Sequence, residues 1–125
     1  MGFLSNMRDF KNLKLWERSH RLTLSVYRAS GGFPREEMYG LTSQMRRASA
    51  SIAANIAEGC GRDSKADFAR FLQIAAGSAS ELEYQAILAR DLKLLDEPEF
   101  NTITEEVTQV KRMLSAFIRT LKADN

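Results

Sequence analysis

The chain has 125 residues, of which 44% are hydrophobic and 27% charged, and a formal net charge of +2. This length predicts one domain, and the apolar content is sufficient for a single core, which argues against a disordered chain. No apolar run approaches the ~20 residues of a membrane span, and the N-terminus lacks the apolar core of a signal peptide. A single cysteine, Cys60, excludes an intramolecular disulfide, so we expect a cytoplasmic protein.

The first predicted helix covers residues 12–30. Its expected main apolar face consists of Leu13, Trp16, His20, Leu24 and Tyr27, with the single histidine as a partly buried core residue. A second apolar face lies more than a quarter turn away and consists of Leu15, Leu22 and Val26. One neighbour in a bundle does not need so wide an apolar surface. The pattern therefore predicts a homo-oligomer in which part of this helix is buried.

The same helix carries a row of cations, which we call the basic stripe. It consists of Lys11, Lys14, Arg18, Arg21 and Arg28, with helical spacings of 3, 4, 3 and 7. Five cations on one side of a helix can follow a phosphate backbone, which makes this the candidate nucleic-acid-binding site. The alternative is a solvated face that keeps the protein soluble. Nothing in the sequence predicts base reading, because there is no recognition helix, zinc site or aromatic stacking platform.

Residues 34–58 are predicted to form one continuous helix of about seven turns, begun by Pro34 and stopped by Gly59 and Gly61. Its apolar face consists of Leu41, Met45, Ala48, Ile52 and Ile56. Beside it runs a row that we call the polar seam: Gln44, Arg47, Ser51, Asn55 and Glu58. Such a row indicates hydrogen bonds within the bundle or between subunits, and the alternative is a wetted helix flank. Arg46 and Arg47 could grip phosphate, but we favour a structural ion pair between an arginine and Glu58, Glu81 or Glu83 across the bundle.

The third helix is predicted over residues 65–92. Ser64 is its expected cap, with Asp67 three residues on. Gly77 interrupts the helix and is predicted to mark a tight helix–helix crossing.

The fourth helix is predicted over residues 97–122, with Asp96 and Glu99 as a capping pair. Its apolar residues follow a heptad pattern: Phe100, Ile103, Val107, Val110, Leu114, Phe117 and Leu121. Charges run from acidic to basic along it, which complements the helix dipole and calls for no functional explanation. Short joints between four long helices predict an all-α, antiparallel up-down-up-down four-helix bundle, with residues 1–10 as a flexible N-terminal segment.

Four runs of sequence carry a resemblance to a known family. They are YGLTSQMRRA at 39–48, SIAANIAEG at 51–59, FARFLQIA at 68–75 and GSASELE at 77–83. With Trp16, Tyr27 and the Phe33-Pro34 turn, the chain resembles the bacterial 23S rRNA intervening-sequence proteins, also called S23 ribosomal proteins, over roughly residues 10–121. The resemblance implies a four-helix bundle that assembles into a ring-like homo-oligomer, a pentamer in members of known architecture.

The resemblance also suggests partners. Members of the family are encoded within inserts of ribosomal RNA genes. A related bundle acts as an accessory protein in diversity-generating retroelements, where a basic surface engages reverse transcriptase and nucleic acid. RNA or a nucleic-acid-processing protein is thus the partner that the resemblance implies.

The inventory of reactive residues predicts no enzyme. One histidine and one cysteine cannot form a zinc site, no Glu-x-x-His pair of a di-iron bundle is present, and no glycine-rich phosphate loop precedes a helix. We therefore expect no catalytic residue, metal, cofactor, small-molecule substrate or membrane partner. The sequence predicts a non-catalytic oligomeric binding module for RNA or a nucleoprotein partner. The alternative is a protein-scaffolding oligomer with no nucleic-acid role.

Overall fold

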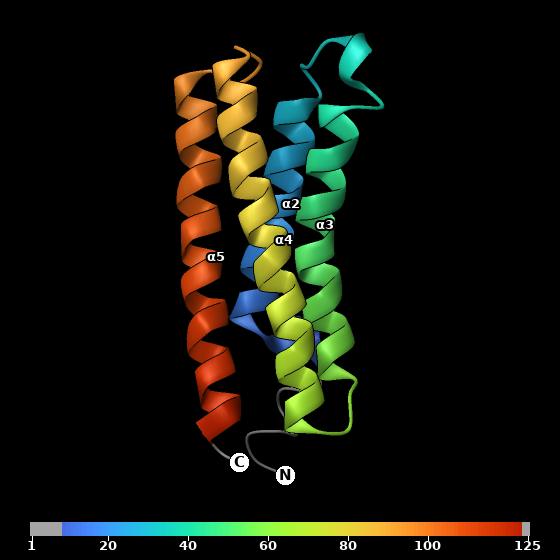
Figure 1. The fold of residues 1–125 in the computed structure, drawn as a ribbon, viewed down its shortest axis with the longest axis vertical. Coiled ribbons are helices and arrows are strands. Elements are labelled where there is room, and N and C mark those ends of the chain that lie inside the picture. The colour runs from blue at the N-terminus through green and yellow to red at the C-terminus, as the bar shows by residue number, and fades with distance from the viewer. Residues whose placement is uncertain (1–8, 124–125) are drawn as a thin grey trace.

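The computed structural model describes residues 9–123. Within that range it is an all-α bundle, and its elements in chain order are η1 (Phe10–Asn12), α2 (Lys14–Ser30), η2 (Arg35–Glu37), α3 (Leu41–Cys60), α4 (Lys65–Asp91) and α5 (Glu97–Ala123). In Figure 1 each long helix runs opposite to the one before it, so the start of α2 and the end of α5 lie at the same end. Most of the predicted flexible segment 1–10 lies outside the described residues, and Phe10 opens η1.

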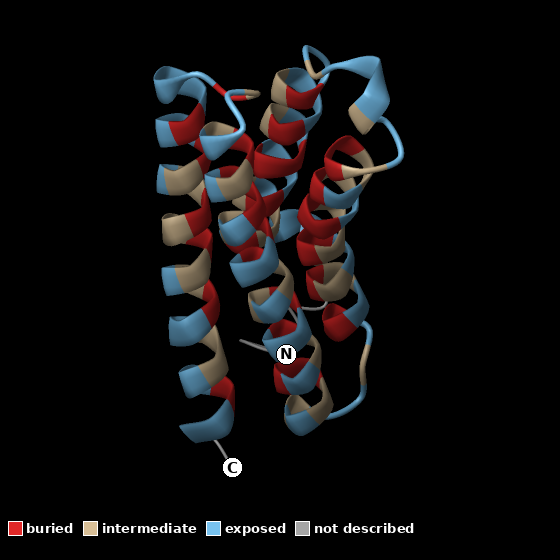
Figure 2. Ribbon diagram, turned by 45° about the horizontal axis from the view of Figure 1, so that its top comes forward, coloured by how far each residue is buried: buried red, intermediate tan, exposed pale blue. Residues whose placement is uncertain are grey.

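The four long helices pack in a closed arrangement. α3 contacts α2 and α4, and α5 contacts α4 and α2. The buried residues form one continuous core along the inward faces, and exposed residues cover the outside (Figure 2). No helix within residues 9–123 is long and apolar enough to cross a bilayer.

Two apolar faces predicted from spacing are confirmed. All five residues of the predicted apolar face of α3, from Leu41 to Ile56, are buried. The heptad residues of α5 are also buried, except Phe117, which is half-buried against Phe68 of α4. Both predicted caps are present as well: the Asp67 backbone N–H donates to Ser64 Oγ at 3.1 Å, and the Glu99 N–H donates to Asp96 Oδ1 at 2.8 Å.

The predicted orientation of the first helix is wrong. The side that packs into the core is the one with Leu22 and Val26, both fully buried, whereas Leu24 is 40% exposed and Tyr27 45% exposed. His20 is also exposed and stacks on Trp16, with ring centroids 5.1 Å apart. The prediction was wrong because it gave more weight to the face with the larger and aromatic side chains, whereas the other apolar face is the buried one.

Small polar residues explain why α2 turns this way. The Thr23 hydroxyl, buried at the contact with α3, is within 3.1 Å of both the Ser19 carbonyl of its own helix and the Ser49 carbonyl of α3. The Ser19 hydroxyl donates to the Leu15 carbonyl at 2.8 Å. Because their hydroxyls are satisfied by backbone carbonyls, these small side chains can be buried at low cost and allow the two helices to approach closely.

The predicted continuous helix over 34–58 is interrupted at its start. Residues Arg35–Glu37 form a 3-10 turn, the chain turns again at 38–40, and α3 begins only at Leu41. The Glu37 carboxylate accepts the Leu41 backbone N–H at 3.2 Å, which replaces a backbone partner that the first turn lacks. The helix also continues past the predicted stop at Gly59 and ends after Cys60, with Gly61 at the C-cap.

The tight helix crossing lies at a different glycine from the predicted one. A Cβ built on Gly77 meets nothing within 4 Å, so the prediction for Gly77 is wrong. A Cβ on Gly59 would lie 2.9 Å from Phe68 Cδ1 and 3.1 Å from Phe71 Cβ. Gly59 is thus the residue that lets the end of α3 approach the start of α4.

Candidate nucleic-acid interface

The basic stripe does not lie on a single helix. Lys11 belongs to η1, and α2 begins at Lys14. Arg18, Arg21 and Arg28 follow on α2, where Arg18 is half-buried and the other two are exposed. The five residues therefore differ in how available their charges are to a ligand.

Arg18 links two helices. Its Nη2 lies 3.1 Å from Glu106 Oε1 on α5, with the two side chains 34% and 30% exposed. The Arg18 Nε is buried and has no hydrogen-bond partner. Because Glu106 compensates the charge and the side chain lies between α2 and α5, Arg18 has a structural role, and its charge is less available than that of an exposed, unpaired cation.

Arg21 pairs with Glu17 one turn earlier, at 3.5 Å. Both side chains are more than 60% exposed. Exposed pairs of this kind contribute little free energy and exchange readily with solvent, so Arg21 remains available to an incoming phosphate.

Lys14 and Arg28 have no ion-pair partner within residues 9–123. Arg28 lines a shallow groove of about 320 Å³ between α2 and α5, which Glu99 also lines. Lys14, Arg21 and Arg28 are spaced seven residues apart, or about 10 Å along the helix axis, and lie on one side of α2. These three residues are the accessible part of the basic stripe on α2, and Lys11 of η1 is exposed as well.

The middle of the polar seam lies within the bundle. Ser51 Oγ is 2.9 Å from Ser78 Oγ on α4, and Asn55 Nδ2 donates to the Ser51 carbonyl at 2.8 Å. The serine pair joins α3 to α4 at a half-buried position, and the Asn55 bond lies within α3.

The ends of the polar seam point outward. Gln44, Arg47 and Glu58 are exposed, and Glu58 pairs with Arg62 at 2.8 Å. Arg47 lines a groove of about 280 Å³ together with Glu81 of α4. Among residues 9–123 no ion pair to Arg47 is found.

Arg46, the neighbour of Arg47, has a structural role, but through contacts with the end of α2 and not through the predicted ion pair with a glutamate. Its Nε donates to Ser30 Oγ at 2.8 Å and its Nη2 to the Tyr27 carbonyl at 3.2 Å. Its guanidinium lies 4.7 Å from the centre of the Tyr27 ring. A cation at the C-terminal end of α2 complements the helix dipole, and its bond to the Tyr27 carbonyl adds to the one that this carbonyl accepts from the Gly31 N–H at 3.1 Å.

Cys60 shows no sign of reactivity. It is buried, and burial followed by the nearby Asp9 charge raises the pKa of the thiol from 9.0 to about 11. A thiol with this pKa is almost entirely protonated at neutral pH, which removes the nucleophilic form. In the part of the chain that the structure describes, no cluster of three or more His, Cys, Asp or Glu side chains is arranged to hold a metal ion.

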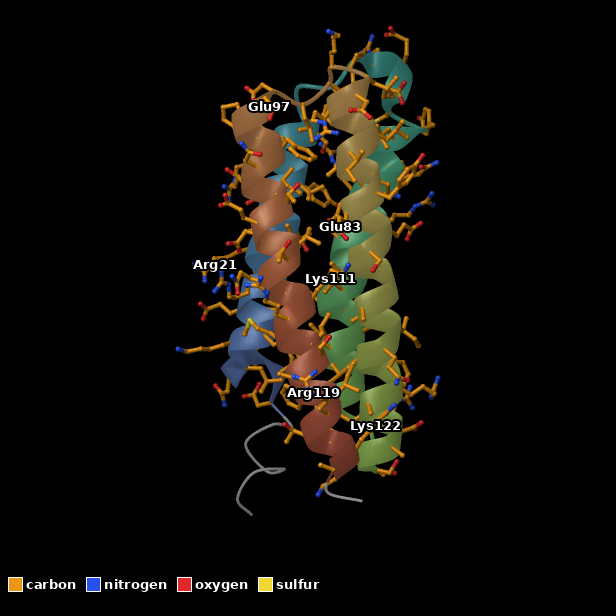
Figure 3. All side chains as sticks on the ribbon, turned by 60° about the vertical axis from the view of Figure 1, so that its left-hand side comes forward. Arg21, Glu83, Glu97, Lys111, Arg119 and Lys122 are labelled. Atoms are coloured by element: carbon orange, nitrogen blue, oxygen red, sulfur yellow. The ribbon has the colours of Figure 1, made fainter. Side chains whose placement is uncertain are left out.

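The structure also shows a basic surface on α5. From the sequence, we explained the position of these cations by the helix dipole alone. Lys111 and Arg119 lie on the C-terminal half of α5, on the side that faces α4 and Glu83 (Figure 3). Arg21 of the basic stripe projects from α2 in the same view. The sequence contains a signal for this surface, because Lys111 lies about three turns before the end of the helix, beyond the last turn in which the dipole favours a cation.

Comparisons with known proteins agree with this fold. The model of the 23S rRNA-intervening sequence protein family matches residues 11–116. A crystal structure of a protein with unknown function from the S23 ribosomal protein family of Bacteroides thetaiotaomicron is similar, with a TM-score of 0.79 and 24% sequence identity over 90% of this chain and 99% of that one. At that identity the similarity shows the fold alone. No curated protein matches the chain.

Proposed function

We propose that this chain, which belongs to the 23S rRNA-intervening sequence protein family, is a non-catalytic bundle that binds RNA through α2. The observation that carries the proposal is the outward row of Lys14, Arg21 and Arg28: among residues 9–123 Lys14 and Arg28 have no ion-pair partner, and Arg21 is weakly paired. Cations at a regular spacing on an exposed helix contact backbone phosphates without reading bases.

RNA is the polyanion that the family description favours, because that description refers to a sequence within 23S rRNA. The chain has a net charge of only +2, so its binding depends on the local charge of α2 rather than on the whole molecule. Each contact is weak, and we expect binding to be strongly sensitive to salt.

Self-association is the second part of the proposal. Leu24 and Tyr27 lie on α2 beside the basic stripe and are 40% and 45% exposed. An apolar strip on a helix that already buries its other side is typical of an interface between subunits. A homo-oligomer would present the basic row once per subunit, and several weak contacts to one RNA would then add up by avidity.

The test is the binding of a labelled single-stranded RNA at increasing salt. We would neutralise the accessible cations in a Lys14→Gln, Arg21→Gln, Arg28→Gln variant, which leaves Arg18 in place to hold α5. The matched control is Arg35→Gln, Arg47→Gln, Lys93→Gln, which removes the same charge from exposed positions elsewhere. We expect the first variant to lose binding, with a salt dependence shallower by about 0.7 per lost phosphate contact, and the control to bind as wild type.

Salt-independent binding, or equal loss in both variants, would contradict the RNA proposal. An oligomer that is indifferent to RNA at low salt would instead favour the scaffold alternative. Exposed aromatic residues at the η2 loop and on α4 are what support that alternative, since Tyr39 is 95% exposed and Tyr84 61% exposed.

A further inference from the structure

A second group of cations lies in a groove between α4 and α5, away from α2. The groove has a volume of about 360 Å³ and is lined by Glu83 of α4 and by Thr108, Lys111, Arg112, Ser115 and Arg119 of α5. Three lining residues are cations and one is a carboxylate, so the lining carries a net charge of +2. It lies on the α4 side of α5, whereas Glu106 of the same helix faces Arg18 of α2.

The one carboxylate of the groove is already engaged. Glu83 Oε1 accepts a hydrogen bond from Lys111 Nζ at 2.9 Å (Figure 3). This pair leaves Arg112 and Arg119 with no ion-pair partner among residues 9–123. Two guanidinium groups in one groove without a counter-charge repel each other, and an anion between them would remove that repulsion.

The helix dipole does not account for these arginines. Its effect is confined to about the last turn, and in α5 only Lys122 occupies that turn. Arg112 lies about three turns before the end of the helix at Ala123. The charge at Arg112 therefore needs a different explanation from the charge at Lys122.

Hydroxyl groups complete the set of donors. Ser115 follows Arg112 by three residues and precedes Arg119 by four, so the three side chains share one helix face. The Thr108 hydroxyl already donates to the Thr104 carbonyl at 2.9 Å. Ser115 is exposed, and its hydroxyl has no hydrogen-bond partner within the described residues. Two guanidinium groups around a free hydroxyl are a donor set that suits a tetrahedral oxyanion.

We propose that the α4–α5 groove is a phosphate-binding site, in which Arg112 and Arg119 hold the phosphate group and Ser115 donates a hydrogen bond to it. The pair Lys111–Glu83 forms one wall of the groove. The site is separate from the α2 surface and does not depend on the RNA proposal. The phosphate can belong to a small phosphorylated compound or to a nucleic-acid backbone, because both carry phosphate oxygens that accept hydrogen bonds from arginine and serine.

The test is a titration of the full chain, labelled with ¹⁵N, with inorganic pyrophosphate at low ionic strength. We expect amide shifts centred on Ser115. An Arg112→Gln, Arg119→Gln variant should bind pyrophosphate at least about tenfold more weakly, since two charge-assisted hydrogen bonds are lost. The charge-matched control Arg35→Gln, Arg47→Gln should bind as wild type. Shifts centred elsewhere, or equal affinities of the two variants, would overturn the proposal.

A competition experiment identifies the source of the phosphate. If a short single-stranded RNA displaces pyrophosphate and shifts the Ser115 amide, the natural ligand is a nucleic-acid backbone. If RNA leaves Ser115 unchanged while pyrophosphate shifts it, the ligand is a small phosphorylated compound. The Lys14→Gln, Arg21→Gln, Arg28→Gln variant should retain pyrophosphate binding, and loss of binding there would overturn the existence of a separate site.

Discussion

Arg18 on α2 and Glu106 on α5 form an ion pair across the bundle, with Nη2 and Oε1 3.1 Å apart. The two residues are 88 positions apart in the sequence, and their pairing ties the first long helix to the last one. The pairing also removes one charge from the middle of the basic stripe, because Arg18, the most buried of its cations, is neutralised within the protein. The accessible charges of α2 are therefore at Lys14, Arg21 and Arg28.

Loss of the Arg18–Glu106 pair should destabilise the bundle modestly. We expect Arg18→Gln and Glu106→Gln each to lower the free energy of unfolding by about 0.5–1 kcal/mol, because both side chains remain about one third exposed. Urea denaturation of both single variants and the double variant measures the coupling. A coupling energy of zero would show that the pair contributes nothing to stability.

Gly59→Ala should lower the free energy of unfolding, whereas Gly77→Ala should raise it. At Gly59 the new methyl group would lie 2.9 Å from the Phe68 ring, and we expect a loss of about 1–3 kcal/mol. At Gly77 the methyl group meets nothing within 4 Å, so the better helix propensity of alanine should add up to about 1 kcal/mol. Thermal unfolding of the two variants beside wild type checks both signs, and a stabilised Gly59→Ala protein would contradict the close crossing.

Arg46→Ala should cost more stability than Arg47→Ala. Arg46 donates to Ser30 Oγ and to the Tyr27 carbonyl at the end of α2, and the loss of both bonds is worth about 1–2 kcal/mol. Arg47 is exposed and makes no such bond within the described part of the chain, and its replacement should change stability by less than about 0.5 kcal/mol. Chemical denaturation of the adjacent variants makes the comparison, and equal effects would refute the structural role of Arg46.

Cys60 should resist alkylation in the folded protein. The folded pKa of about 11 lies above the ordinary 9.0, so the thiol contributes fully to stability below about pH 9 and loses that contribution as pH rises through 11. We expect iodoacetamide to react slowly at pH 8 with the native chain and quickly after denaturation in urea. Similar rates in both states would mean that the thiol is not protected.

Leu24→Glu should abolish self-association without unfolding the subunit. Leu24 is 40% exposed on α2, so a charge there is tolerated in the monomer and is costly in an apolar interface. Leu92→Glu, at a residue 53% exposed just after α4, is the matched control. Light scattering gives the mass of each protein, and an unchanged mass for Leu24→Glu would exclude this part of α2 from the interface. The number of subunits, a pentamer by resemblance, stays a prediction until that mass is measured.

The periodicity of the sequence alone determined most of the fold. Heptad spacing in α5 and the 4, 3, 4, 4 spacing from Leu41 to Ile56 predicted their buried faces, because an apolar residue every third or fourth position can face only one side of a helix. The capping pairs Ser64/Asp67 and Asp96/Glu99 were equally readable, since both partners lie within four residues of each other. Long runs of sequence also identified the family.

Only the tertiary structure decided which of the two faces of α2 is buried. Both faces are apolar, and the choice rests on the contact of Thr23 with the Ser49 carbonyl of another helix, which no local pattern contains. The tertiary structure also decided that the tight crossing lies at Gly59 and not at Gly77. It decided as well that Glu106 neutralises Arg18. Finally, it brings Arg112, Ser115 and Arg119 together beside Glu83. Periodicity specifies the direction of a side chain relative to its own helix, whereas what it meets depends on how neighbouring helices are packed.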